Sequence, residues 1–287
     1  MEKTLNFTFK SKGQEIKLGS GTSYGIVTYS GIAAPDVLLA KTQNVLQDGS
    51  AVSGIYLIDR LISVTAELSI TQNQELHRQQ LIHFFNPKTT GNLIVNYCGV
   101  ERNIDYIVNK FDVITPATLW ENLSFTIDLI CPKPYWNDMD SFGKNIAHIT
   151  KQFAFPLGIP IGKGKIMGYK TFKREVLLNN PGDAATGVEI VFVALRGTVV
   201  NPKLIKASTG EYLRAVLTMQ KGDRLTFNTN ERSKRVELNG ENVIHLLDRH
   251  STFFNIDVGD NLLRYDADEN YINIEVRPYY TPKYLGV

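Results

Sequence analysis

The chain has little cysteine, no excess charge of either sign and no long apolar run. Its two cysteines, Cys98 and Cys131, form neither a C-x-x-C pair nor a disulfide ladder, so we expect buried thiols in a chain that folds in a reducing compartment. The 31 basic and 29 acidic residues nearly cancel, which argues against a coat for nucleic acid or anionic membrane. The most apolar run, 188–195, is far shorter than the ~20 residues that cross a bilayer. The N-terminus also lacks the apolar stretch of a signal peptide.

Apart from these absences, the composition is that of an ordinary globular protein. Hydrophobic residues make up 43% of the 287 positions and charged residues 21%, values that exclude a disordered or collagen-like chain. A chain of this length can bury a large core without a metal or a disulfide. At roughly 150 residues for a domain, the length favours two domains.

Apolar and polar residues alternate with a period of two in many short runs. The run 63–70 shows this alternation, and 122–129 repeats it. Because successive side chains of a strand point to opposite faces, such runs predict half-buried strands. Turn-forming pairs such as Asn239-Gly240 lie between them. The sequence therefore predicts a mainly β protein made of two β-sandwich or barrel domains.

One segment departs from the strand pattern. Residues 71–74 have the spacing of a capping box, with a hydroxyl at the cap and an amide three residues later. Leu81 lies three and four positions before two phenylalanines, which places these apolar side chains on one helix face. Pro87 then disfavours helical geometry at the residue before it. We predict a single α-helix at about 72–85, lying on the sheet of the N-terminal domain.

A proline-rich segment marks the domain boundary. The sequence Cys-Pro-Lys-Pro-Tyr-Trp at 131–136 cannot continue a strand ladder, because proline has no N–H to donate. Glycine and proline are frequent in the residues that follow, with aromatic residues between them. We predict an N-terminal β domain over 1–135, a Pro/Gly-rich connecting arm over 136–168 and a C-terminal β domain over 169–287.

No motif of catalysis or metal binding has the context that it requires. Residues 21–25 match the G-x-S-x-G sequence of serine hydrolases, but a strand pattern follows them instead of a helix. The five histidines lack H-E-x-x-H spacing, and none lies near a cysteine pair. We therefore predict no catalytic, cofactor-binding or metal-binding residue. A hydrolase acting through Ser23 remains as an alternative hypothesis.

Several features follow one another in a distinctive order. Asp48-Gly49 precedes Arg60 and its alternating strand, the lone helix comes next, and the strand 123–130 runs into Pro-Tyr-Trp at 134–136. This order resembles the distal tail protein family, the siphovirus tail component of tailed phages, and the second half of the chain matches in order as well. The resemblance assigns a structural or interface role to six residues: Asp48, Gly49, Arg60, Pro134, Tyr135 and Trp136.

The resemblance implies a non-enzymatic virion protein of the tail tip or baseplate, made in the host cytoplasm. In the family, six copies of an N-terminal β domain with one helix close into a ring, and the C-terminal domain is a galectin-like sandwich. The implied partners are further copies of the chain, the tail tube protein, the tail-associated hub or lysin, and the receptor-binding protein. No cofactor, no specific nucleic-acid binding and no membrane insertion is implied.

The alternative function is a carbohydrate-binding adhesion module that acts through the C-terminal sandwich. In such a module Tyr212 or Tyr265 would stack on a sugar ring. The chain has no tryptophan after Trp136, so the tryptophan platform of sugar-binding galectins has no counterpart here. A galectin-like fold would therefore not by itself assign sugar binding, because folds do not determine function.

Overall fold

The computed structural model divides the chain into two compact units, and each is described by itself. Unit 1 comprises Met1–Met139 together with Lys283–Val287, and unit 2 comprises Asp140–Pro282. The prediction of a mainly β fold is confirmed. The structure describes residues 4–43, 48–69, 73–114, 122–139, 142–143, 148–151, 168–171 and 174–287, and gives only the backbone for 142–143, 148–151 and 168–171.

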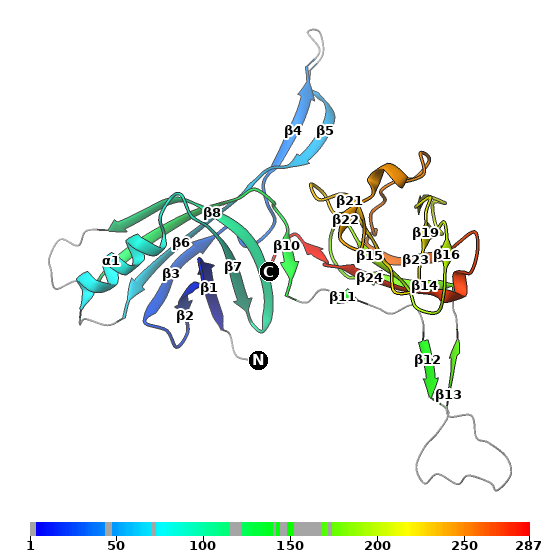
Figure 1. Ribbon diagram of the computed structural model, residues 1–287. Coiled ribbons are helices and arrows are strands. Elements are labelled where there is room, and N and C mark those ends of the chain that lie inside the picture. Colours follow the sequence, from blue (N-terminus) through cyan, green and yellow to red (C-terminus); the bar gives the residue numbers. More distant parts are fainter. Residues whose placement is uncertain are drawn as a thin grey trace, which may run out of the picture. The chain divides into compact units, whose positions relative to one another are not determined.

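Unit 1 is built around one antiparallel sheet (Figure 1). Its strands lie in the order β2 (Gln14–Gly19), β1 (Leu5–Ser11), β7 (Thr90–Tyr97), β8 (Val100–Ile114), β9 (Ser124–Cys131), β6 (Arg60–Leu68) and β3 (Tyr24–Ser30). Two short strands, β10 (Trp136–Asp138) and β25 (Lys283–Tyr284), pair with each other, and β10 also pairs with β8. The strand predicted over 122–129 is therefore β9, at the centre of this sheet.

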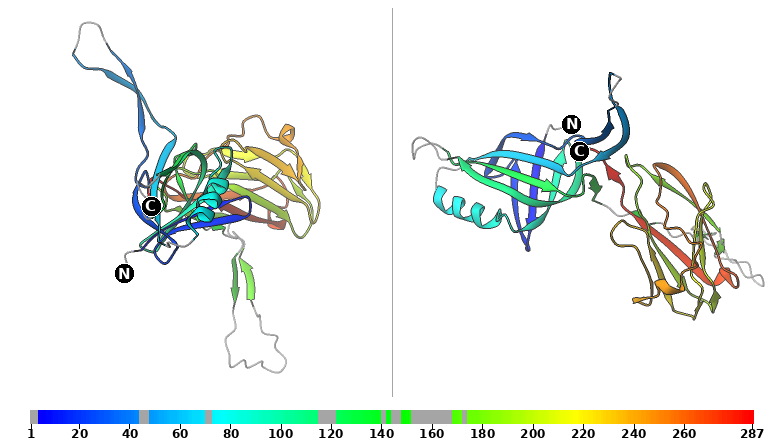
Figure 2. Two further views of the ribbon diagram at one scale, coloured as in Figure 1. Left: turned by 90° about the vertical axis from the view of Figure 1, so that its left-hand side faces the viewer. Right: turned by 90° about the horizontal axis from the view of Figure 1, so that it is seen from above.

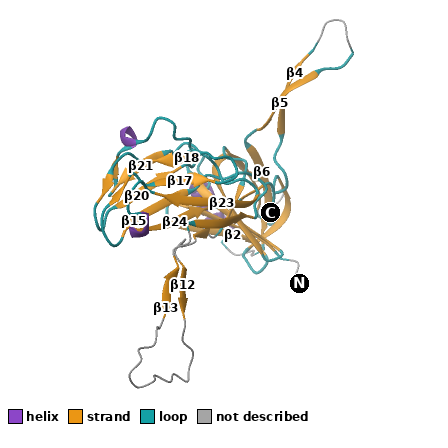
Figure 3. Ribbon diagram, turned by 90° about the vertical axis from the view of Figure 1, so that its right-hand side faces the viewer, coloured by secondary structure: helices purple, strands orange, loops and turns teal. Residues whose placement is uncertain are grey.

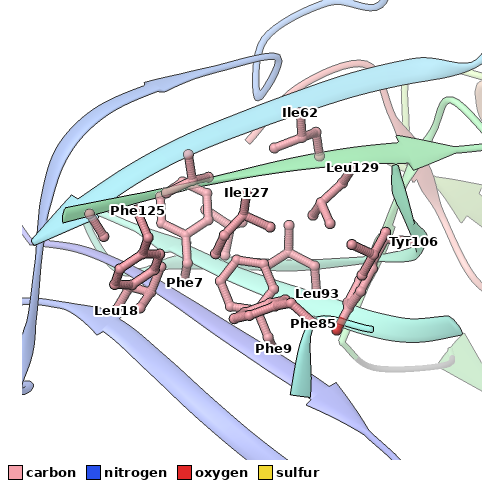
Figure 4. Close-up of a cluster of buried hydrophobic side chains, with 14 of the residues drawn as sticks. Phe7, Phe9, Leu18, Ile62, Phe85, Leu93, Tyr106, Phe125, Ile127 and Leu129 are labelled. Carbon is pink, nitrogen blue, oxygen red and sulfur yellow. The ribbon is translucent and has the colours of Figure 1, made fainter. Parts of the chain in front are cut away.

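The core of unit 1 comes from the alternation that the sequence showed. In β6 every second residue from Arg60 to Leu68 is buried, and in β9 the buried residues begin at Phe125. Phenylalanine rings gather on the inner face, where Phe9 meets both Phe85 and Tyr106 edge to face (Figure 4). Aromatic pairs in this geometry add attraction beyond the area that they bury.

The helix α1 (Gln74–Phe84) supplies part of this core, as predicted. Leu81, Phe84 and Phe85 are buried against the sheet. The helix begins later than the predicted capping box requires, because the residue that precedes its first turn is Asn73 in a left-handed conformation with φ of 57°. Thr71, the predicted cap, lies outside the described residues. No helix in the described part of the chain is long and apolar enough to cross a membrane.

One hairpin of unit 1 projects away from its sheet. The strands β4 (Val37–Thr42) and β5 (Ala51–Leu57) pair only with each other, with a register shift between Ala40 and Lys41. Figure 1 shows the hairpin standing out from the ends of β3 and β6, and the left view of Figure 2 shows the same projection. We refer to these two strands and their connection as the β4–β5 hairpin.

Unit 2 is a sandwich of two sheets that share one core. Large apolar residues from both sheets, among them Leu204, Phe192 and Phe227, are fully buried between them. Figure 3 shows its strands in orange, joined by loops in teal. One sheet has six strands in the order β11 (Phe142–Gly143), β24 (Ile274–Tyr280), β15 (Glu189–Ala194), β20 (Arg224–Asn228), β21 (Arg235–Leu238) and β22 (Glu241–Asn242). The other sheet has four strands in the order β14 (Glu175–Asn180), β23 (Gly259–Asp266), β17 (Lys203–Lys206) and β18 (Tyr212–Arg214).

The remaining elements of unit 2 are short. They are the strand pair β12 (His148–Lys151) and β13 (Gly168–Thr171), the pair β16 (Val199–Val200) and β19 (Thr218–Met219), and the turns of 3₁₀-helix at Ile244–Leu246 and Tyr271–Asn273. Of the predicted connecting arm over 136–168, residues 140–141, 144–147 and 152–167 lie outside the described residues.

The division of the chain differs from the predicted boundaries at both ends of unit 2. β9 ends at Cys131, one residue later than predicted, and the chain stays in unit 1 until Met139 because β10 pairs with β8. The prediction assigned all of 169–287 to the C-terminal domain. The last five residues instead belong to unit 1, because β25 pairs with β10.

Candidate functional site

The six residues singled out by the family resemblance lie at the two ends of the β4–β5 hairpin. Asp48 and Gly49 are in the connection between the two strands, where Gly49 has a φ of 98° that suits glycine. Arg60 opens β6 directly after β5, and Pro134, Tyr135 and Trp136 follow β9, which pairs with β6. The structure thus brings Arg60, Pro134 and Trp136 together and leaves Asp48 and Gly49 apart from them.

Arg60 is buried at the base of the hairpin and donates to four backbone carbonyls. Only 1% of its surface is exposed. Its Nε donates to the Pro134 oxygen at 2.9 Å, and its Nη2 donates to the Leu285 oxygen at 2.7 Å. Its Nη1 donates to the oxygens of Gly31, at 2.7 Å, and of Ala33. We call Arg60 and the residues of these four carbonyls the Arg60 cluster.

The electrostatics of the Arg60 cluster differ from those of an ion pair. No carboxylate in the described part of the chain pairs with Arg60, and the indole ring of Trp136 lies 5.5 Å from the guanidinium carbon. Burial lowers the pKa of Arg60 from its ordinary value. A buried cation is costly unless its hydrogen-bonding groups are satisfied, and here carbonyl dipoles satisfy them. The cluster therefore fixes backbone segments, and it offers no reactive group.

The segment 283–287 completes this region of unit 1. Trp136 is fully buried and pairs in register with Tyr284. Arg102 stacks on the Tyr284 ring, 3.5 Å from its centroid, and donates to the Gly286 oxygen. The Val287 N–H donates to the Ile32 oxygen at 3.1 Å. Sequence reasoning missed this return of the chain, because nothing in so short a segment shows with which strand it pairs.

The β4–β5 hairpin carries large apolar side chains that the rest of the chain leaves exposed. Ile55 is 68% exposed and Tyr56 is 60% exposed. Exposed apolar residues occur on both strands: Val37, Leu38, Leu39, Val52, Ile55 and Tyr56. Successive residues of a strand point to opposite faces, so Ile55 and Tyr56 place apolar groups on both faces of the hairpin. A surface of this kind is typical of a contact with another protein.

The alternative sites predicted from the sequence do not assemble. Ser23 lies in the turn before β3, and no histidine among the described residues hydrogen-bonds to it. The Nδ1 of His77 lies 2.8 Å from the hydroxyl of the neighbouring residue, Tyr24. Tyr265 is 1% exposed and cannot stack on a sugar, while Tyr212 is half-buried and has the Nζ of Lys203 over one face of its ring, 3.8 Å from the centroid. Among the described residues no group of histidine, cysteine and acidic side chains could hold a metal.

Residues 181–284 match the family model of the siphovirus-type tail component, C-terminal domain. No curated protein sequence matches the chain. The match supports the resemblance found in the second half of the sequence, and it coincides with the greater part of unit 2.

Solved structures extend the likeness to nearly the whole chain. The Dit protein (gp 19.1) of phage SPP1, described as a paradigm of the hub adsorption apparatus in phages that infect Gram-positive hosts, matches with a TM-score of 0.70 at 14% identity, over 96% of this chain and 98% of that one. A chain from the structure of the activated phage p2 baseplate with Ca matches with a TM-score of 0.55 at 9% identity, over 100% of this chain and 100% of that one. The same baseplate with Sr gives 0.53 at 9% identity over 99% of both. The fold is therefore that of a distal tail protein, as the sequence resemblance predicted.

Proposed function

We propose that the chain is a structural protein of a phage tail tip or baseplate, and that six copies join through unit 1 into a ring. The observation that carries the proposal is the β4–β5 hairpin, whose apolar side chains no other part of the described chain covers. The likeness to the SPP1 Dit protein and to the p2 baseplate supports a tail role.

The β4–β5 hairpin has few means of stabilising itself in water. A two-stranded hairpin is marginally stable in water unless a further surface packs on it. Strands of six and seven residues, such as β4 and β5, reach roughly 20 Å at about 3.3 Å per residue. A hairpin of this length that exposes Ile55 and Tyr56 is suited to a partner, and a second copy of the chain is the partner that we propose.

Ring closure requires that each copy offer one surface and receive another, because such contacts are heterologous. We propose that the receiving surface is the β3 side of the sheet. β3 is the terminal strand of the sheet order, so one of its edges is open to pairing in the described structure. Val27 and Leu61 are each 57% exposed there, on β3 and on its neighbour β6.

The finer role of the ring rests on the family resemblance. We propose that it links the tail tube protein to the tail-associated hub or lysin and to the receptor-binding protein, in a virion assembled from chains made in the host cytoplasm. A tube that passes DNA should not bind it tightly. Residues 1–135 carry 11 basic and 12 acidic side chains, a balance that supports weak attraction to phosphates. We propose no enzymatic activity.

The proposal is tested by sedimentation velocity on matched variants. Ile55→Asp places a charge on the hairpin, whereas Leu177→Asp places the same charge on an exposed leucine of unit 2, which is 52% exposed against 68% for Ile55. We expect the wild type and Leu177→Asp to sediment as hexamers and Ile55→Asp to sediment as a monomer. Equal association of the two variants would contradict the role of the hairpin, and a wild type that stays monomeric with its tail partners present would contradict the ring.

A further inference from the structure

We propose that Arg60 and the segment 283–287 form a clamp that fixes the direction of the β4–β5 hairpin, so that assembly depends on the last residues of the chain. The clamp itself is a property of unit 1, and its effect on assembly rests on the proposed ring. Arg60 acts here as a positioning residue, because it contacts the base of the hairpin and none of the apolar side chains that would meet a partner.

The base of the hairpin has few hydrogen bonds of its own. The last bond between its two sides joins the Ile58 N–H to the Asp36 oxygen at 3.2 Å. Residues 31–36, which lead from β3 into β4, belong to no strand. Backbone carbonyls removed from water require partners, so the groups that bond this segment determine where the hairpin begins.

Three consecutive carbonyls of that segment are held from outside it. Gly31 and Ala33 accept from Arg60, which follows the outgoing strand of the hairpin. Ile32, between them, accepts from the N–H of Val287. The segment that leads into β4 is therefore bonded both to Arg60, which follows β5, and to Val287, and these bonds define the base of the hairpin.

The segment 283–287 is itself held by unit 1, which makes it a support for the hairpin. Leu285 accepts from Arg60, and Gly286 accepts from Arg102. Gly286 lies so close to the segment 31–36 that a Cβ on it would come within 3.4 Å of the Ala33 Cα. Arg60 thus bonds three separate segments at once, those that contain Ala33, Pro134 and Leu285.

Arginine suits this task better than any other side chain. Its planar guanidinium carries five N–H donors in a fixed fork, whereas a lysine ammonium is a compact group on a flexible stem. The four carbonyls belong to three segments and are bonded by three different nitrogens of Arg60, so a single lysine nitrogen cannot reach all of them. Phe9 and Phe125 take no part in the hydrogen bonds of the clamp, although Ile32, Trp136 and Val287 pack in the same core. Changes that remove only hydrogen bonds of the clamp should therefore free the hairpin, and the amides of β7 report whether the core is disturbed.

Hydrogen exchange on the full chain, kept dilute enough to be monomeric, tests the clamp. Val287→Pro removes one N–H, and the matched control Val287→Ala keeps it. We expect the amides of β4 and β5 to exchange about fivefold faster in Val287→Pro and about tenfold faster in Arg60→Lys. The effect of the lost N–H is the excess of Val287→Pro over Val287→Ala, because the Val287 side chain itself packs against the core of unit 1. We expect the control Arg78→Ala and the amides of β7 in every variant to match the wild type. Unchanged exchange in the hairpin, or an equal rise in β7, would overturn the clamp.

Coupling and assembly give two further readouts. Because Arg60 and Val287 hold neighbouring carbonyls, the double variant should exchange at most about twofold faster than Arg60→Lys alone, and independent, multiplying effects would overturn the clamp. If the wild type forms hexamers, Val287→Pro should require a higher concentration to form them than Val287→Ala, and equal assembly would overturn the link between clamp and ring. If the wild type never assembles, the ring proposal fails and the exchange result still decides the clamp.

Discussion

The β4–β5 hairpin and the sandwich of unit 2 are made from the same kind of strand but differ in what covers their apolar side chains. In unit 2 the inward-facing residues of one sheet meet those of the other in a shared core. Within one of these sheets, Phe192 and Phe227 pack edge to face with no exposed surface. In the hairpin, Val52 and Ile55 have no such counterpart. The contrast shows that apolar strand residues build a core in one region and stay exposed on both faces in the other, where we propose that a second copy covers them.

The largest expected effect tests this contrast through stability. Phe192→Ala should lower the free energy of unfolding by about 3–5 kcal/mol, because it leaves a cavity in a close-packed core. Ile55→Ala should change it by no more than about 0.5 kcal/mol, because that side chain is already in water in the single chain. Chemical denaturation of dilute protein measures both, and a loss at Ile55 as large as that at Phe192 would show that the hairpin packs within the single chain.

An intermediate effect is expected at the base of the hairpin. Gly31 has a φ of 83°, and a Cβ there would lie 1.9 Å from the Leu61 oxygen, whereas Gly13 has a φ of 78° with open space around it. Gly13→Ala should cost about 1–2 kcal/mol from backbone strain alone. Gly31→Ala should cost about 2 kcal/mol more, because Leu61 is paired with Ile130 of β9 and cannot move away freely. Equal losses in thermal denaturation would show that the base of the hairpin is not tightly built.

The smallest effect concerns the two thiols. Burial raises the pKa of Cys131 to about 12, while Cys98 is half-buried in the turn between β7 and β8. Since the thiolate is the reactive form, the raised pKa leaves Cys131 protonated at pH 8. A thiol reagent should therefore label the folded chain once, at Cys98, and label it twice after denaturation. Rapid labelling of Cys131 in the folded chain would indicate that the Arg60 cluster opens.

The sequence predicted the local features well because their causes are local. Alternation placed the strands that became β6 and β9, and the spacing of Leu81 before Phe84 placed the helix. The start of the helix was less well predicted, because the residue before its first turn is Asn73 in a left-handed conformation, which the capping pattern at 71–74 does not reveal.

The candidate site was predicted only in part because its contacts join distant parts of the chain. The family resemblance singled out Arg60, Pro134 and Trp136, but nothing in the sequence showed that they meet. Their meeting depends on the register of β6 against β9 and on the return of 283–287. A single arginine that bonds Gly31 and Leu285 gives no periodic signal, so only the folded structure reveals the cluster.

The most direct test of the account measures whether a second copy covers the hairpin. Tyr56 is 60% exposed in the single chain, and radical footprinting with mass spectrometry reports the accessibility of its ring in each fraction of a size-exclusion run. The account predicts strong labelling of Tyr56 in the monomer and protection in a fraction of six times 32.2 kDa, with Tyr97, which is 41% exposed in the β7–β8 turn region, as an internal reference. A hexamer in which Tyr56 is labelled as strongly as in the monomer would contradict it.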